Sequence, residues 1–403
     1  MCALCLCVLS PQAAIVGVVL VLPGGGATTA ASPSSPPPPG PPPAPPAPIP
    51  TTAVAATNIA LAGTYLTNFG NYITVNDGTW YTVGSYGTSM YHIHAFEGSY
   101  IIAQNSANNS YNAGQWSKFE FHATSAGGYG YCQSVYNAAT ALDAYNTDTS
   151  TTYNASNSGS GGCGQFSHTT MTPYSMPAAG KFLDNWGYYV TVNAGMWYSV
   201  SSSGSASMYR VEAYGPNWIL AQNAATNAWN ANDWSLFRFH TVGSGYGFCQ
   251  IIYNGNSASD TILGDVSAYN ASDASAGCNG FGHSTMAPYT TPMIGTWTTN
   301  FGSNLTVTAS AWTSVSSYGT STYRIEAYGN NYILAQNSAT AAYNPSLWSL
   351  FRFHPTTGGS YGFCQIIYNG ATAPAALVGD VSAYNASNAA SGCNGFSHTI
   401  ASP

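Results

Sequence analysis

The chain has 403 residues, of which only 5% are Asp, Glu, Lys or Arg, whereas roughly a quarter is ordinary for a globular domain. With six basic residues and a formal net charge of −7, it has no basic surface that could neutralise a run of phosphates, which argues against nucleic acid as a partner. Solubility must come from hydroxyl groups, amide groups and attached sugar.

Residues 1–31 have the organisation of a secretory signal peptide. An apolar run at 13–22 is followed by glycines and by small residues at 27–31, which is typical of an h-region and a cleavage zone. The run is too short for a membrane-spanning helix, so we expect no membrane association after cleavage. No Lys or Arg precedes the run, which leaves an uncleaved anchor or a misassigned start as alternatives.

Residues 32–60 are predicted to form a stalk, because proline dominates 32–50. Proline fixes φ and lacks a backbone donor, so we expect a stiff polyproline II spacer. Residues 35–39, SPPPP, resemble the module of extensin-like, hydroxyproline-rich secreted glycoproteins of plant and green-algal type. The resemblance covers the proline-rich segment alone and implies a cell-wall or matrix protein with modified prolines. A plain proline-rich linker is the alternative.

The remaining chain is one unit written three times, at 61–174, 178–289 and 293–403. Each unit contains Ala-Gln-Asn, a polar loop with one Asn, and then Trp-Ser-x-Phe-x-Phe-His. The connectors 172–177 and 287–292 each contain two prolines and should be stiff. A repeated site indicates multivalent binding or scaffolding more naturally than a single catalytic centre.

Within each unit, short apolar runs have the period of strands. Alternating runs such as 72–75 and 91–96 are separated by Gly, Asn and Ser turns, which predicts a mainly β fold of three tandem small antiparallel β-barrels or β-sandwiches. Residues 295–297, GTW, resemble the opening of lipocalin and avidin barrels, which slightly favours the barrel. Residues 372–381 could hold one short helix.

An exchange of charges between units predicts which strands are neighbours. The second and third units carry Glu on the strand at 209–214 or 323–328 and Arg between the phenylalanines, whereas the first carries His and Glu. Such an exchange is typical of a cross-strand pair on the solvent face. We therefore expect neighbouring strands, with the pairs Glu212 and Arg238, Glu326 and Arg352, and His94 and Glu120.

Cysteines and sequons both indicate an extracellular protein. Besides Cys2, Cys5 and Cys7, each unit has two cysteines, which predicts one disulfide per unit, worth about 3–4 kcal/mol in the chain-entropy model. The pairs are Cys132 with Cys163, Cys249 with Cys278, and Cys364 with Cys393. Sequons predict glycosylation at Asn108, Asn154, Asn270, Asn304 and Asn385.

Residues for catalysis or metal binding are sparse. One Asp recurs per unit (Asp143, Asp265 and Asp380), whereas glycoside hydrolysis needs two facing carboxylates. Two histidines recur per unit without a carboxylate nearby. We therefore expect no catalytic residues, no metal and no cofactor, with a secreted hydrolase as a less favoured alternative.

Glycan binding fits the composition best. Sugar rings stack on aromatic faces while amides and hydroxyls meet their hydroxyl groups. Aromatic candidates stand at 65, 69, 100 and 111 and at their counterparts. The predicted function is a secreted, non-catalytic wall or matrix glycoprotein that binds extracellular polysaccharide or wall glycoproteins multivalently; a purely structural glycoprotein is the alternative. The predicted binding residues are Gln104, Asn105, Tyr111, Gln222, Asn223, Trp229, Gln336, Asn337 and Tyr343.

Overall fold

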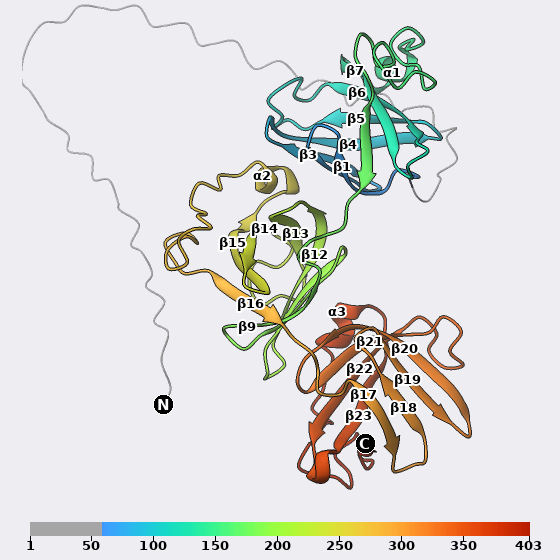
Figure 1. Cartoon of the computed structure of the whole chain (residues 1–403), viewed down its shortest axis with the longest axis vertical. Coiled ribbons are helices and arrows are strands. Elements are labelled where there is room, and N and C mark those ends of the chain that lie inside the picture. Colours follow the sequence, from blue (N-terminus) through green and yellow to red (C-terminus); the bar gives the residue numbers. More distant parts are fainter. Residues whose placement is uncertain (1–58) are drawn as a thin grey trace, which may run out of the picture. The chain divides into compact units, whose positions relative to one another are not determined.

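The structure, a computed structural model, describes residues 59–403, which form three closed, eight-stranded antiparallel β-barrels in tandem (Figure 1). The predicted mainly β class is confirmed, and the architecture is the barrel rather than the sandwich. The predicted signal peptide, the stalk as far as residue 58, and Cys2, Cys5 and Cys7 lie outside the described residues. Within residues 59–403, no helix has the length and apolarity needed to cross a membrane.

Each barrel is a meander in which successive strands pair and the eighth strand closes against the first. The first barrel comprises β1 (Gly63–Thr67), β2 (Tyr72–Val75), β3 (Thr79–Gly84), β4 (Gly87–Glu97), β5 (Tyr100–Asn105), β6 (Trp116–Ala123), β7 (Tyr129–Ala138), α1 (Ala141–Asn146) and β8 (Thr169–Pro173). The second comprises β9 (Gly180–Asp184), β10 (Tyr189–Val192), β11 (Met196–Val200), β12 (Ala206–Tyr214), β13 (Trp218–Asn223), β14 (Trp234–Val242), β15 (Gly245–Gly255), α2 (Ala258–Ile262) and β16 (Ser284–Pro288). The third comprises β17 (Gly295–Thr299), β18 (Asn304–Val307), β19 (Ala311–Ser316), β20 (Gly319–Tyr328), β21 (Tyr332–Asn337), β22 (Trp348–Pro355), η1 (Thr357–Gly359), β23 (Tyr361–Gly370), α3 (Ala373–Leu377) and β24 (Thr399–Ser402).

Aromatic stacking fills the interior of every barrel. In the first, the fully buried Trp80 on β3 stacks on Phe119 of β6 with ring centroids 4.5 Å apart. The alternation of each strand directs these rings inward, where an eight-stranded barrel is just wide enough to be filled by side chains. The same stack recurs as Trp197 with Phe237 and Trp312 with Phe351.

A short helix and a disulfide loop follow the seventh strand of each barrel. The helices begin at hydroxyl caps, such as Thr140, whose side chain accepts from the Asp143 backbone N–H and so satisfies one of the first helical donors. The helix expected within 372–381 is α3. Each barrel contains one disulfide, as predicted, with Cα atoms 5.5 to 5.6 Å apart: Cys132 with Cys163, Cys249 with Cys278, and Cys364 with Cys393.

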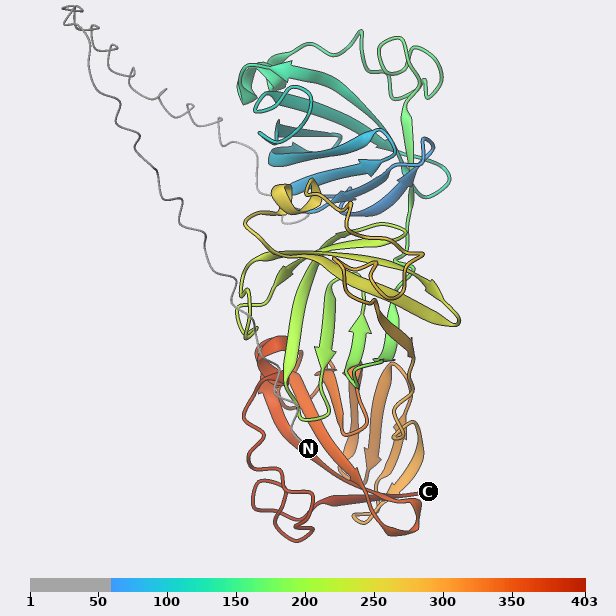
Figure 2. The same cartoon turned by 90° about the vertical axis from the view of Figure 1, so that its left-hand side faces the viewer.

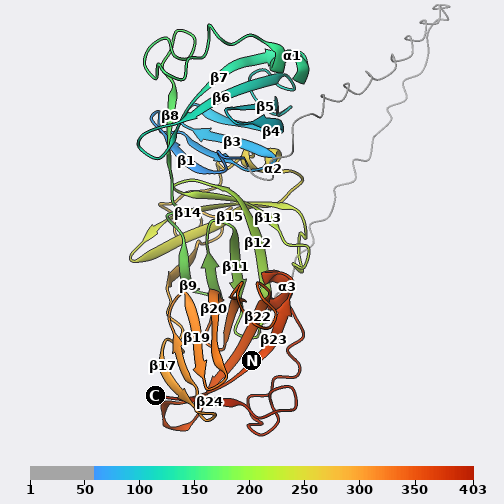
Figure 3. The same cartoon turned by 90° about the vertical axis from the view of Figure 1, so that its right-hand side faces the viewer.

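Successive barrels pack through an apolar contact that occurs twice. Tyr81 and Met90 of the first barrel enter one buried cluster with α2 and with Trp218, Leu220 and Leu236 of the second. In the same way, side chains of the second barrel meet α3 and three side chains of the third: Tyr198 and Met208 with Tyr332, Leu334 and Leu350. We call these two contacts the junctions. Figures 2 and 3 show the ribbons of the three barrels from two further sides.

A connector tyrosine completes each junction. The Tyr174 ring lies 4.9 Å from the Tyr72 ring, and the Tyr174 carbonyl accepts a hydrogen bond from the Tyr214 hydroxyl. The first of these partners belongs to the preceding barrel and the second to the following one. The second connector repeats the arrangement with Tyr189, Tyr289 and Tyr328.

The predicted cross-strand pair between Glu212 and Arg238 is wrong. Strand β13 lies between β12 and β14, so the two strands are not neighbours. Glu212 instead pairs with Arg210 on its own strand and accepts a hydrogen bond from Asn76 of the preceding barrel. The residue exchange therefore marks a junction, since the first barrel has no described barrel before it. Glu326 corresponds, with Arg324 and Asn193.

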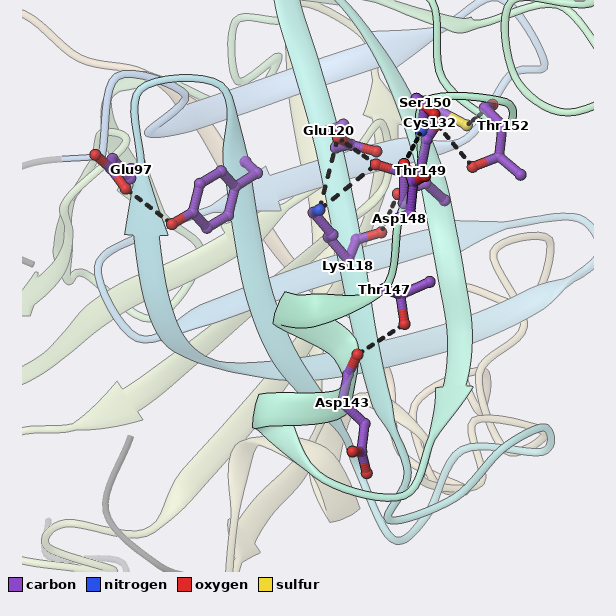
Figure 4. Close-up of polar contacts among 12 residues, drawn as sticks. Glu97, Lys118, Glu120, Cys132, Asp143, Thr147, Asp148, Thr149, Ser150 and Thr152 are labelled. Atoms are coloured by element: carbon purple, nitrogen blue, oxygen red, sulfur yellow. Dashed lines mark hydrogen bonds and ion pairs between the residues drawn. The ribbon is translucent and has the colours of Figure 1, made fainter. Parts of the chain in front are cut away.

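The two end faces of the array differ from the faces in the junctions. The first barrel has Lys118 where the later barrels have the buried Leu236 and Leu350, and Lys118 contacts Glu120 and Thr149 instead (Figure 4). The third barrel has threonines at 313 and 322 where the first two barrels place Tyr and Met in the junctions. Polar side chains thus replace the apolar contact at both ends.

The second barrel packs against the third through Tyr198 and Met208, where the third barrel itself carries threonines. Replacing both residues by threonine should weaken the junction between the second and third barrels. In the variant Tyr198→Thr with Met208→Thr, each truncated side chain loses burial worth about 1.5–3 kcal/mol. We expect calorimetry to separate the unfolding of the third barrel from that of the second, and protease to cut the connector at 287–292 faster. The control, Thr313→Ser with Thr322→Ser, should behave as the wild type; an unchanged transition in the double variant would contradict the junction.

Candidate functional site

The predicted aromatic residues at 111, 229 and 343 are among the most exposed large side chains in residues 59–403. Tyr111 is 83% exposed, Trp229 82% and Tyr343 86%. Each lies on the loop after the fifth strand of its barrel. We call these loops the aromatic loops.

Each aromatic loop is held by a left-handed turn and a buried amide. The residue after the aromatic is Asn with a φ of 51° in all three barrels, a conformation that Asn tolerates better than most residues. In the first barrel, the Asn105 amide donates to the carbonyls of Asn112 and Tyr136, and its Oδ1 accepts from Ser117. The aromatic therefore projects from a fixed turn. Asn223 and Asn337 make the same contacts.

The glutamines of the predicted site also bind the aromatic loop. The Gln104 amide donates to the Gly114 carbonyl at 3.0 Å. Gln222 and Gln336 do the same in their barrels and accept a hydrogen bond from Arg210 and Arg324. The Gln-Asn pairs thus position the loop through groups that are already hydrogen-bonded, while the aromatic side chain remains free.

In the third barrel, the aromatic loop forms one wall of a cleft of about 530 Å³, within the range of about 300–1,000 Å³ that is common for ligand pockets. Tyr318, Tyr343 and Tyr368 line it, and Tyr318 is 99% exposed. Asn337 and Gln365 also line it, so the structure brings the predicted residues Asn337 and Tyr343 together, while the predicted Gln336 is not among the lining residues. No Asp, Glu, Lys, Arg or His is among the lining residues.

The lining offers neutral hydrogen-bonding groups. Thr320, Ser321 and Thr322 provide hydroxyls, and the Gln365 amide donates to Ser349 behind the wall. Burial raises the pKa of the Tyr323 phenol, which keeps this group neutral near pH 7. The cleft therefore suits an uncharged ligand with a flat face and several hydroxyl groups.

Sequence reasoning missed three of the four tyrosines that line the cleft, namely Tyr318, Tyr368 and Tyr323. Tyr368 could have been found, because a Tyr-Asn pair lies near the end of the seventh strand in every unit, at Tyr136, Tyr253 and Tyr368. Tyr86 occupies the position of Tyr318 in the first barrel, whereas Ser203 occupies it in the second. The aromatic surroundings are thus fullest in the first and third barrels.

Other aromatic candidates do not reach this site. Tyr65, Phe182 and Trp297 are buried in the barrel interiors, and Trp218 and Tyr332 are buried in the junctions. Phe69, Trp186 and Phe301 are exposed at the turn between the first two strands. Position 111 and its counterparts are therefore the predicted aromatics that are exposed on the loop after the fifth strand, and Tyr343 among them lines the cleft.

Two hollows of about 530 and 510 Å³ lie beside the first junction and are lined by Arg210 and Glu212. The two side chains are paired with each other, and Asn76 donates to the Glu212 carboxylate. These charges are thus occupied in holding the barrels together. We assign the hollows to the junction rather than to a ligand.

The recurrent histidines meet in pairs. His122 on β6 and His168 have ring centroids 4.8 Å apart, and the Tyr153 hydroxyl lies 3.2 Å from His122 Nδ1. Gly130, opposite His122 on β7, provides the space, since a Cβ there would lie 2.6 Å from the ring. Among residues 59–403, no group of three or more His, Cys, Asp or Glu side chains is arranged to hold a metal ion.

The predicted glycosylation sites differ in their surroundings. Asn154, Asn270 and Asn385 are exposed in the disulfide loops, and Asn304 is exposed at the start of β18. Asn108 instead donates its amide to Ser259 and Asp260 of the second barrel. An N-linked glycan would be attached to that same nitrogen.

Comparison of the chain with protein-family models, curated proteins and solved structures finds no match. What the site can do is therefore argued from its own chemistry. The aromatic loops offer exposed ring faces, and the cleft adds neutral hydrogen-bonding groups. This combination is the basis of the functional proposal.

Acid should destabilise the barrels through the histidine pairs. Burial, and then the neighbouring histidine, lower the pKa of His122, His240 and His354 below the usual 6.5. The unfolded chain therefore takes up these protons first, so stability is full above about pH 6.5 and falls as pH drops toward the folded-state pKa. We expect a lower Tm at pH 5 than at about pH 7.5, and a smaller drop in the triple His→Gln variant at 122, 240 and 354. An equal drop would exclude these groups as the cause.

Glycan occupancy should follow the contacts of each sequon. We expect glycopeptide mapping of the protein, expressed through a secretory pathway, to find sugar at Asn154, Asn270, Asn304 and Asn385 and little at Asn108, because the Asn108 amide is engaged at the first junction. Ser259→Ala with Asp260→Ala should raise occupancy at Asn108 if the barrels dock before glycosylation. Full occupancy of Asn108 in the wild type would contradict this.

Proposed function

We propose that this protein is a secreted, non-catalytic glycoprotein of the cell wall or extracellular matrix that binds polysaccharide through the aromatic loops of its three barrels. The observation that carries the proposal is the exposed aromatic on a fixed turn, present in every barrel. A large aromatic that is more than four-fifths exposed contributes little to its own fold. Its retention in all three units supports a role in contact with a ligand.

The chemistry of the cleft supports a sugar as that ligand. A pyranose ring has a flat face of C–H groups that packs against an aromatic ring, and its hydroxyls need donors and acceptors around the rim. Tyr318, Tyr343 and Tyr368 provide ring faces, and Gln365 with the nearby hydroxyls provides the polar groups. The lack of charge in the lining argues against phosphate or carboxylate ligands.

An extracellular location is supported by the disulfides and by the surface positions of the sequons. One disulfide in each barrel suits an oxidising compartment, and the loops that carry Asn154, Asn270 and Asn385 are exposed. The proline-rich segment adds the resemblance to wall glycoproteins. Together these features favour the wall or matrix as the place of action.

The aspartates expected to recur, Asp143, Asp265 and Asp380, are not all equivalent. Asp265 and Asp380 accept hydrogen bonds from the backbone N–H groups of Ser267 and Ser382, and in the first barrel Asp148 accepts the corresponding bond from Ser150, whereas Asp143 lies in the first turn of α1. These places in turns and at a helix start support a non-catalytic role. A purely structural glycoprotein remains the second candidate, favoured by the closely packed junctions.

Removing the aromatic loops one after another should reduce retention on insoluble wall polysaccharide steeply. Each of Tyr111→Ala, Trp229→Ala and Tyr343→Ala removes one stacking face, and because the three sites act on one chain the triple variant should lose about 10²-fold in apparent affinity. Pull-down of the full secreted chain measures the effect.

The disulfide loops provide a matched control for this experiment. Phe166, Phe281 and Phe396 are 74%, 75% and 74% exposed, so the triple Phe→Ala variant removes a similar aromatic area elsewhere. It should bind as the wild type does. Equal retention of both triple variants, or no retention of the wild-type protein, would contradict the glycan proposal and favour the structural role.

A further inference from the structure

A cluster of two histidines and one tyrosine occurs once in every barrel, beside the disulfide. In the first barrel it consists of His122, Tyr153 and His168, and Tyr153 forms a β-bridge with Cys163. The disulfide therefore ties the tyrosine to the strand that faces His122. We call these groups the His-Tyr-His clusters; the others are His240, Tyr269 and His283, and His354, Tyr384 and His398.

The clusters share one geometry. The two imidazole centroids are 4.8 Å apart in all three barrels, and the tyrosine centroid lies 5.3 to 5.5 Å from the second histidine. The tyrosine oxygen lies 2.7 to 3.2 Å from Nδ1 of the first histidine. A metal held at about 2.0 Å by one nitrogen of each ring places imidazole centroids about 4.5–5 Å apart. The observed spacing matches that value.

The second histidine of each cluster is buried with a nitrogen that has no partner. His168 is 1% exposed, His283 7% and His398 1%; Nδ1 of each has no hydrogen-bond partner in the protein, and Nε2 of His283 and His398 has none either. In the first barrel, His168 Nε2 lies 2.8 Å from the Gly162 carbonyl. Since a carbonyl only accepts, Nε2 carries the proton and Nδ1 presents a lone pair. A metal-binding histidine is commonly oriented by such a bond from its other nitrogen.

We propose that each His-Tyr-His cluster binds one Cu(II) ion through a nitrogen of each imidazole and the tyrosine oxygen. Imidazole and oxygen donors suit Cu(II), which also binds most tightly among the divalent ions of the first transition row. On binding, the phenol O–H bond breaks, a Cu–O bond forms, and the proton leaves to solvent. No electron transfer is involved.

The charge of the residue between the two phenylalanines of the sixth strand differs between the clusters. Glu120 places a negative charge near Tyr153, whereas Arg238 and Arg352 place a positive charge near Tyr269 and Tyr384. A nearby carboxylate attracts a divalent cation and a guanidinium repels it. The first barrel should therefore bind Cu(II) most tightly.

Titration of the full secreted chain with Cu(II), followed by calorimetry and electron paramagnetic resonance, tests the proposal. We expect three ions per chain, nitrogen hyperfine structure, and a visible charge-transfer band from copper-bound tyrosinate. Tyr153→Phe, Tyr269→Phe and Tyr384→Phe together keep the ring packing and should abolish the band. Glu120→Gln should weaken the tightest site about tenfold.

A matched triple variant controls for other copper-binding groups. Tyr136→Phe, Tyr253→Phe and Tyr368→Phe remove the same number of hydroxyls from the seventh strands, outside the clusters, and should leave all three sites intact. The proposal is overturned if the wild-type chain binds no Cu(II), if the band persists in the cluster variant, or if both triple variants lose copper equally. Zn(II) as competitor should displace Cu(II) only in large excess; displacement at equal concentration would also overturn the choice of metal.

Discussion

The buried amide of Asn105, with its counterparts Asn223 and Asn337, is the interaction on which the proposed binding surface depends. It donates to two carbonyls from separate segments and accepts from a serine on a third. In a chain with so few charges, neutral bonds of this kind must fix the loops. If the buried amide lost its partners, the folded state would be destabilised by about 1–3 kcal/mol for each unsatisfied group. The hydrogen bonds therefore keep the loop and the strand in one arrangement.

The contact between barrels also uses few charged residues. Two ion pairs lie where barrels meet, Arg210 with Glu212 and Arg324 with Glu326, and each glutamate also accepts a hydrogen bond from an asparagine of the preceding barrel. The preceding barrel contributes a tyrosine and a methionine to the apolar part of each junction. The connector tyrosine contacts both barrels.

Much of the fold was predictable because its causes are local and repeated. Alternating runs, Gly and Asn turns and two cysteines per unit predicted three disulfide-containing β domains. Tyr111, Trp229 and Tyr343 were predicted as binding residues, and the structure shows that their side chains are exposed. Closure of the barrel could not be derived, since it depends on the eighth strand meeting the first across a hundred residues. The pair between Glu212 and Arg238 was wrong for a related reason: a change shared by two positions can reflect a neighbouring domain as well as a neighbouring strand. The tyrosines at 318 and 368 join the cleft only through folding.

The polar end faces restrict how such a protein could change in length. Among the three described barrels, the first has Lys118 and the third has threonines at 313 and 322 where the junctions place apolar side chains, while the middle barrel carries both apolar faces. A further copy packed against the first or the third barrel in the same way would meet the pair of Lys118 and Glu120 or lack the tyrosine and methionine contact. Duplication of the middle barrel would instead preserve every junction. We therefore expect homologous chains with more barrels to have gained them by duplication of the middle barrel.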